Sequence, residues 1–198
     1  MAQPKTAERA PVEAVPEAPA KSDAKPQRKR ITRRKAVEQR VRSYFEALDT
    51  RDVRGMLEHW REDAVDDIVP VGVLRGRDEM RAYFESMFAA MPDARTTVTR
   101  LVAGEQSCAV EWRIEGTFNG DPYMGIEPTG RHVEVRGLDL FEVENDEIVS
   151  NTGYFDGASF ARQIGMLPAD GSGADRAMKS AFNAVTKLRR AVAERRPA

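Results

Sequence analysis

Asp139 stands in an unusual setting for a carboxylic acid. It lies in VEVRGLDLFEVEN, residues 133–145, whose period-two alternation predicts a strand with one face made of Gly137, Asp139, Phe141 and Val143. A carboxyl group among apolar neighbours is desolvated, which raises its pKa so that it donates a hydrogen bond or acts as a base near neutral pH. The alternative is that Asp139 pairs with an arginine or faces solvent.

Two further aspartates and one tyrosine are candidates for the same pocket. Asp66 and Asp67 are adjacent in VDDIV, residues 65–69, so they point to opposite faces of that predicted strand. An inward Asp66 is a candidate general base, although both aspartates could instead lie at an exposed strand start. Tyr44 falls on the apolar stripe of a predicted helix, and a buried phenol needs a partner such as a carboxylate or a substrate oxygen.

The composition argues against several other chemistries. The 198 residues include one cysteine and two histidines, too few for an internal disulfide, a cysteine-rich metal site or a histidine-based one. No glycine-rich phosphate loop or dinucleotide-binding fingerprint occurs. We therefore expect no metal and no cofactor, and we expect Cys108 to be a small buried apolar residue rather than a nucleophile.

The elements that must position these side chains follow from the spacing of apolar residues. Helical spacing predicts three helices, at 33–49, 51–60 and 77–90. Further along the chain it predicts a short helix at 158–164. Alternation predicts strands at 65–69, 95–103, 108–118, 132–144 and 147–155. This order predicts an α+β fold: a cone-shaped, curved antiparallel sheet packed against the N-terminal helices around an apolar pocket, plus a C-terminal helix.

The two ends of the chain are basic and its middle is acidic. Residues 1–35 carry ten Lys or Arg against four Asp or Glu, and residues 175–198 carry seven against two, although the whole chain has a net charge of −1. The acidic middle argues against nucleic-acid binding by the domain, whereas the basic ends suit acidic partners. We predict a disordered basic leader at 1–32, a domain at 33–168, a linker at 169–174 and a basic amphipathic helix in 175–198.

The C-terminal helix carries an apolar stripe, which is made of Met178, Phe182, Val185, Leu188 and Val192. Such a stripe docks on the domain or on a second subunit, which we prefer because the stripe is narrow, or it lies on a membrane surface. The chain contains no apolar run of transmembrane length and no secretory signal sequence. We therefore expect a reduced, soluble, cytoplasmic protein.

Four stretches together resemble one known family. They are YFEALDTRDVRGMLEHWREDAV, GRDEMRAYFESM, GIEPTGRHVEVRGLDLFEVENDEIV and FARQIGMLP. From about residue 36 to 168 the chain is similar to the nuclear transport factor 2-like superfamily, and most closely to its SnoaL-like, ester cyclase branch. The resemblance implies a cone-shaped α+β barrel with a deep apolar pocket, which often forms a dimer through the outer face of its sheet.

The resemblance also implies roles for single residues. The acid of SnoaL-like polyketide cyclases matches Gly153, so that acid is missing here, and the cyclase histidine on the preceding strand matches Asp139. Ketosteroid isomerase shares the fold, and its two oxyanion-hole residues match Tyr44 and Asp139. Its general base falls near Ile68, so Asp66 or Asp67 would have to take that role.

These observations lead to two hypotheses. The first is a cofactor-free isomerase or cyclase that enolises a small apolar carbonyl compound, with Asp139 and Tyr44 as hydrogen-bond donors and Asp66 as the base. The alternative is a non-catalytic small-ligand-binding protein or a dimeric interaction protein of the same fold. In either case we expect the ligand to be lined by His59, Trp60, Ile68, Phe88, Trp112, Phe141 and Tyr154.

Overall fold

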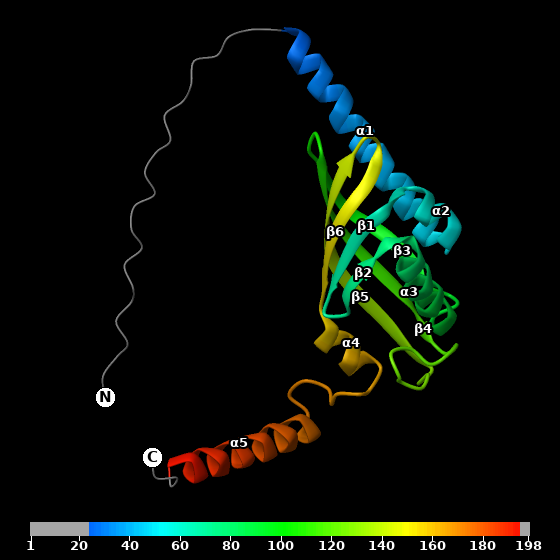
Figure 1. Cartoon of the computed structure of the whole chain (residues 1–198). Coiled ribbons are helices and arrows are strands. Elements are labelled where there is room, and N and C mark those ends of the chain that lie inside the picture. The colour runs from blue at the N-terminus through cyan, green and yellow to red at the C-terminus, as the bar shows by residue number, and fades with distance from the viewer. Residues whose placement is uncertain (1–23, 195–198) are drawn as a thin grey trace.

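The computed structural model describes residues 24–194, in which helices cover one face of a curved sheet (Figure 1). The helices are α1 (Ala24–Asp49), α2 (Val53–Glu58), α3 (Gly76–Ala90), α4 (Gly157–Gln163) and α5 (Gly173–Glu194). The strands are β1 (Trp60–Val69), β2 (Gly72–Arg75), β3 (Arg95–Ala103), β4 (Ser107–Phe118), β5 (Arg131–Glu144) and β6 (Glu147–Phe155). The predicted α+β class is confirmed.

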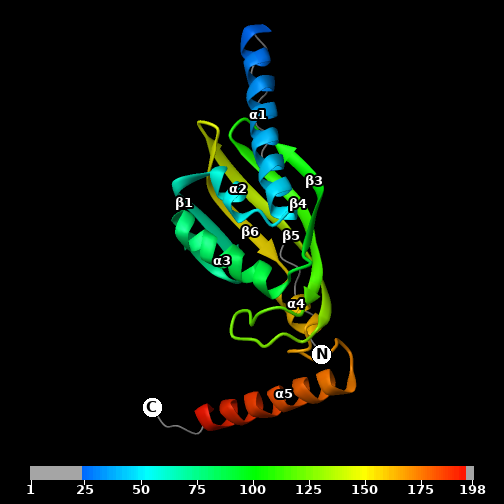
Figure 2. The same ribbon diagram turned by 90° about the vertical axis from the view of Figure 1, so that its right-hand side faces the viewer.

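The six strands form one sheet in the order β2-β1-β6-β5-β4-β3. All neighbours are antiparallel except β1 and β6, which run parallel. The sequence predicted an antiparallel sheet. The parallel pair arises because the chain leaves β1, forms α3 and the β3–β5 meander, and returns beside β1. Figure 2 shows that α1, α2 and α3 lie on the same face of this sheet.

The predicted strand at 65–69 starts too late. β1 begins at Trp60, so the predicted helix at 51–60 was wrong at its end, and α2 stops at Glu58. The charged run that follows Trp60 hides the strand, and the pairing of β1 with β6 shifts register between Trp60 and Val65, so that Trp60, Ala64 and Asp66 are buried while Glu62 is exposed. The structure also adds β2, a mostly exposed edge strand that the sequence did not predict.

The start of α1 corrects the predicted leader. Residues 24–32 are helical rather than disordered, and residues 1–23 of that leader lie outside the described residues. Lysine and arginine favour helices, and one arginine in this extension and one just after it tie this part of α1 to the end of the sheet. Arg30 pairs with Glu105, and Arg34 Nε donates to the carbonyl oxygen of Ala103 at 3.1 Å. The remaining predicted elements agree with the structure to within two residues, apart from the predicted end of the C-terminal helix at 195–198, which lies outside the described residues.

An aromatic cluster joins α1 to the sheet. Tyr44 packs edge-on against Phe45, Trp60 and Phe141, with ring centroids 5.3, 5.7 and 5.6 Å apart. All four side chains are buried. Such edge-to-face contacts add to the free energy gained by burying the rings. The cluster fixes where the Tyr44 ring lies relative to β1 and β5.

Gly137 on β5 makes room for the indole of Trp112. The two residues are paired across β4 and β5. A Cβ atom at position 137 would overlap the six-membered ring of Trp112. The missing side chain therefore lets the indole lie across the neighbouring strand on the helix-covered face.

The last helix lies apart from the sheet. α5 follows α4 at one end of the molecule and extends away from it (Figures 1 and 2). Met178, Phe182, Val185, Leu188 and Val192 are all exposed. Docking of this stripe on its own domain, which the sequence favoured as one of two options, is therefore not observed. No helix among residues 24–194 combines the length and apolarity that crossing a bilayer requires.

We expect Gly137→Ala to lower the free energy of unfolding by about 1–3 kcal/mol, because the new methyl group displaces the Trp112 ring. Gly173→Ala is the control: its Cβ would meet no atom within 4 Å, and the change should stay within about 0.5 kcal/mol. Urea unfolding followed by far-ultraviolet circular dichroism measures both. Equal stability of the two variants would contradict the close approach of Trp112 to β5.

Candidate active site

An apolar cavity lies between the helices and the inner face of the sheet. The cavity has a volume of about 100 Å³, by a measure in which one water molecule occupies about 10–15 Å³. Most of its lining is aromatic or aliphatic. The lining residues are Tyr44, Leu48, Asp66, Ile68, Tyr83, Phe84, Met87, Met91, Trp112, Ile114, Tyr123, Met124, Val135, Asp139, Asn151, Gly153, Phe155 and Phe160.

Asp66 enters this cavity from β1. Its side chain is 1% exposed, whereas Asp67 points to the opposite face of the strand. Asn151 Nδ2 donates to Asp66 Oδ1 at 2.9 Å. Burial raises the pKa of Asp66 to about 7, the hydrogen bond from Asn151 opposes this rise, and the charge of Asp139 adds to it.

Asp139 enters the same cavity from β5 and is 9% exposed. Burial raises its pKa to about 7, and the nearby polar groups of Trp112 and Asn151 moderate the rise. The indole N–H of Trp112 makes no hydrogen bond of good geometry to the described residues, so its effect on Asp139 is one of proximity. The prediction that Asp139 lies on an apolar, helix-covered face is confirmed.

β6 runs between the two carboxyl groups. Asn151 is paired with Asp66 on β1, and Gly153 is paired with Asp139 on β5. A Cβ atom at Gly153 would lie 2.7 Å from Asp139 Oδ1 and 3.4 Å from Asn151 Nδ2. The absence of a side chain at 153 therefore leaves the space that the Asp139 carboxyl occupies. Among the described residues, Asn151 Oδ1 has no hydrogen-bond partner.

Tyr44 completes the polar part of the cavity. Burial raises the pKa of Tyr44 well above its ordinary value, and the charges of Asp66 and Asp139 raise it further. Its phenol is therefore neutral near pH 7 and suited to donating a hydrogen bond. The structure thus brings Tyr44, Asp66 and Asp139, the three residues that the sequence singled out for chemistry, to one cavity.

The two carboxyl groups have no cation to compensate them. No Lys, Arg or His is among the residues that line the cavity. Burial disfavours ionisation of both carboxyls and raises the pKa of each to about 7, and the charge of Asp139 adds to the rise of the Asp66 pKa. One protonated and one ionised carboxyl can act together as hydrogen-bond donor and base.

The predicted ligand-contacting residues divide into two groups. Ile68 and Trp112 line the cavity. Trp60, Phe88 and Phe141 do not, because they are buried in the core that supports it. Tyr154 does not line the cavity either. It is 54% exposed and directly follows Gly153 in β6, so its side chain points to the outer face of the sheet.

His59 was also predicted to contact the ligand, and the structure places it elsewhere. It lines a larger, polar groove of about 750 Å³ between α1 and the β5–β6 turn. There His59 Nδ1 lies 3.1 Å from Arg40, which also pairs with Asp146. Burial and the charge of Arg40 lower the pKa of His59. The carboxyl groups of this groove, Glu105, Glu144 and Asp146, are not buried, so it is not a candidate site for enolisation.

Sequence reasoning missed several cavity residues. Asn151 and Phe155 share a face with Gly153 by simple alternation, so the pattern SNTGYF contains the signal for both. Tyr83 and Tyr123 come from α3 and the β4–β5 loop, and their rings meet at 6.4 Å. Burial raises the pKa of both phenols. The contact between this loop and α3 is a tertiary contact, so no local sequence pattern reveals it.

Among the described residues, no cluster of three or more His, Cys, Asp or Glu side chains is arranged to hold a metal ion. The unpaired Cys108 is buried outside the cavity lining, and burial raises the pKa of its thiol to about 11. Its placement as a small buried residue agrees with the sequence prediction.

Comparison with known families identifies the class of protein. Residues 38–164 match the model of the SnoaL-like polyketide cyclase family. This match covers more than half of the chain, and the chain belongs to that family. It also agrees with the α+β cone of the structure, in which N-terminal helices cover a curved sheet. Among curated proteins, none matches the chain by sequence.

Solved structures share this fold at low sequence identity. AclR from Streptomyces galilaeus is 20% identical, with 81% of this chain and 96% of that chain covered and a TM-score of 0.63. TsrD from Streptomyces laurentii is 23% identical over 68% of this chain and 98% of that chain, with a TM-score of 0.60. A protein of Catenulispora acidiphila with a ketosteroid isomerase-like fold is 19% identical over 67% and 96%, with a TM-score of 0.55.

The buried carboxyls predict an unusual dependence of stability on pH. Their folded-state pKa of about 7 lies above the unfolded value of 3.8, so the folded protein binds more protons between these values. The free energy of unfolding should therefore fall as pH rises from about 4 to about 7. Asp139→Asn should be more stable than the parent at about pH 8, by about 1 kcal/mol or more, and lose this advantage near pH 4.

Urea unfolding of the parent and the variant across this pH range measures the effect. Asp67→Asn is the matched control, because that carboxyl lies on the opposite face of β1. A stability difference between Asp139→Asn and the parent that does not change with pH would show that the Asp139 carboxyl keeps its ordinary pKa.

Proposed function

We propose that this protein is a cofactor-free enzyme of the isomerase or cyclase type, which enolises a small apolar carbonyl compound. The observation that carries the proposal is the pair of buried carboxyl groups, Asp66 and Asp139, that face one apolar cavity beside Tyr44. Burying carboxyl groups in such surroundings lowers the stability of the fold, so their presence in a cavity indicates a functional role. Membership of the SnoaL-like polyketide cyclase family supports the same type of reaction.

The proposed reaction begins with removal of a proton. The Asp66 carboxylate takes the proton from the carbon next to the substrate carbonyl, and the electron pair of that C–H bond forms the enolate. Tyr44 and protonated Asp139 donate hydrogen bonds to the enolate oxygen, where negative charge develops. Asp66 then returns its proton to another carbon in an isomerisation. In a cyclisation, the enolate carbon attacks a second carbonyl and the proton goes to the new alkoxide.

Asn151 has a supporting role in this scheme. Its amide N–H bonds to Asp66 and stabilises the ionised form. In the SnoaL-like cyclases that this chain resembles, the acid matches the position of Gly153, which carries no carboxyl group here. The space beside Gly153 is filled by the Asp139 carboxyl, which supports Asp139 as the acid of this chain.

The second candidate function is binding without chemistry. Gly153 at the position of the cyclase acid favours it, because a family member that lacks that acid can retain the cavity as a ligand site. We also propose a homodimer through the outer face of the sheet, supported by the exposed apolar side chains of Leu138, Leu140 and Tyr154. A cytoplasmic location is a further proposal, in keeping with a single unpaired cysteine.

Exchange of α-protons for deuterium in a simple enolisable ketone, 2-tetralone, tests the proposal. Nuclear magnetic resonance follows the rate with the full-length protein. We expect Asp66→Asn and Asp139→Asn each to lower the catalysed rate by about 100-fold or more, because one removes the base and the other weakens a donor. Asp67→Asn should keep the rate within about twofold, because it changes the neighbouring residue on the opposite face.

Circular dichroism of each variant controls for folding. Equal rates for Asp66→Asn, Asp67→Asn and the parent would overturn the assignment of the base. If the parent binds the ketone saturably but never accelerates exchange above the rate in buffer, the second candidate function replaces the first.

A further inference from the structure

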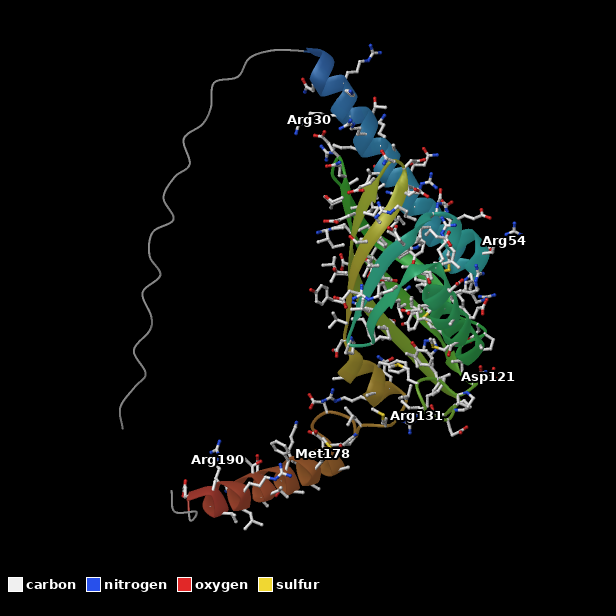
Figure 3. All side chains as sticks on the ribbon, viewed as in Figure 1. Arg30, Arg54, Asp121, Arg131, Met178 and Arg190 are labelled. Atoms are coloured by element: carbon white, nitrogen blue, oxygen red, sulfur yellow. The ribbon has the colours of Figure 1, made fainter. Side chains whose placement is uncertain are left out.

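α5 presents an apolar face that no residue of the described range 24–194 covers. Phe182 is 70% exposed and Leu188 is 66% exposed, and Met178, Val185 and Val192 continue the stripe at helical spacing. Monomeric proteins rarely expose contiguous large apolar side chains in this way without a binding partner. Figure 3 shows Met178 and Arg190 on this helix, away from the sheet.

The opposite side of α5 is basic. Arg176, Lys179, Lys187 and Arg190 recur at spacings of three to eight residues that place them on one side of the helix. Within α5, five Lys or Arg residues stand against two acidic residues, Asp175 and Glu194. Asp175 is buried at the start of the helix and pairs with Lys179 at 2.7 Å. Apart from that first turn, the helix is therefore a cationic amphipathic element.

Arg189 distinguishes between possible partners of the apolar face. It follows Phe182 by seven residues and Val185 by four, so it occupies a position within the apolar stripe. A dry protein interface would bury its guanidinium without a partner, which is costly. At a lipid surface the long side chain can reach the phosphate groups while its methylene groups stay among apolar neighbours.

Charge also argues against pairing of α5 with itself. Two copies of this helix packed through their apolar stripes would bring both Arg189 side chains into the shared interface, whereas an anionic lipid surface attracts every exposed lysine and arginine. The combination of a strong apolar face, a basic polar face and low overall hydrophobicity is the pattern of helices that lie in a membrane interface.

α5 also lies close in sequence to elements that line the cavity. Met124, which lines the cavity and is 59% exposed, comes from the loop between β4 and β5. Phe160 of α4 meets Tyr123 of that loop, with ring centroids 6.5 Å apart. Residues of this loop and of α4 therefore line the cavity on the side of the molecule from which the chain continues into α5 (Figures 1 and 3).

We propose that α5 docks the protein on an anionic lipid surface, with Phe182 and Leu188 inserted among the lipid chains and the basic residues at the headgroups. The docking is peripheral and reversible, since one amphipathic helix carries it. It is independent of the chemistry in the cavity.

Flotation of the full-length protein with vesicles tests this. We expect binding to vesicles of equal parts phosphatidylcholine and phosphatidylglycerol, and binding weaker by at least about tenfold to phosphatidylcholine alone. Raising the ionic strength from about 0.1 M to about 1 M should weaken binding, because screening shortens from about 10 Å to about 3 Å. Phe182→Asp should bind more weakly than Asn183→Asp by about tenfold or more.

The two variants change charge equally at adjacent residues, so their difference reports insertion of the apolar face. Sedimentation of both variants without vesicles is the second measurement. Failure of the parent to float with anionic vesicles overturns the proposal. So does equal binding by the two variants. If the parent does not bind vesicles and Phe182→Asp converts a dimer into a monomer, the apolar face is an interface between copies of this chain.

Discussion

Two carboxyl groups face one apolar cavity whose lining contains no cationic side chain. Desolvation disfavours ionisation of either group, and ionisation of one disfavours that of the other. The pKa values of Asp66 and Asp139 consequently rise to about 7, where a small change in surroundings decides which carboxyl holds the proton. A bound carbonyl oxygen would favour the proton on the donor that faces it. The chemistry proposed for the site therefore follows mainly from the desolvation of these carboxyls, which the fold must tolerate.

The strands tolerate it by supplying space and one amide. β6 lies between β1 and β5, so Asn151 reaches Asp66 and Gly153 leaves room for Asp139. Gly137 plays the same part for the Trp112 indole. The buried aromatic cluster beneath Tyr44 holds the phenol in place. Preorganised donors of this kind lose little free energy when charge develops in a reaction. The glycines are thus as important to the site as the side chains.

The sequence correctly predicted the features that depend on local alternation and helical spacing, namely which faces of strands and helices are buried. Asp139 and Tyr44 fell on buried faces as expected, because apolar neighbours at period two or 3.6 reveal the face. The prediction failed where tertiary structure decides. Trp60 is apolar whether it ends a helix or begins a strand, and only the pairing with β6 makes it the first residue of β1. Tyr154 is aromatic yet faces outward, because its neighbours Gly153 and Phe155 face the cavity and side chains alternate along β6.

Charge and the apolar stripe together orient the proposed docking. Residues 36–174 carry 26 Asp or Glu against 14 Lys or Arg, so an anionic lipid surface repels most of the domain while it attracts α5. It also attracts the basic start of α1, which includes Arg28, Arg30 and Arg34 and lies at the opposite end of the molecule (Figure 3). The exposed apolar stripe of α5 therefore decides which end meets the lipid, because insertion of apolar side chains adds to the attraction of charges there. Met124 and Phe160 line the cavity from the β4–β5 loop and from α4, near that end of the molecule. Docking through α5 would thus bring this side of the cavity towards the lipid.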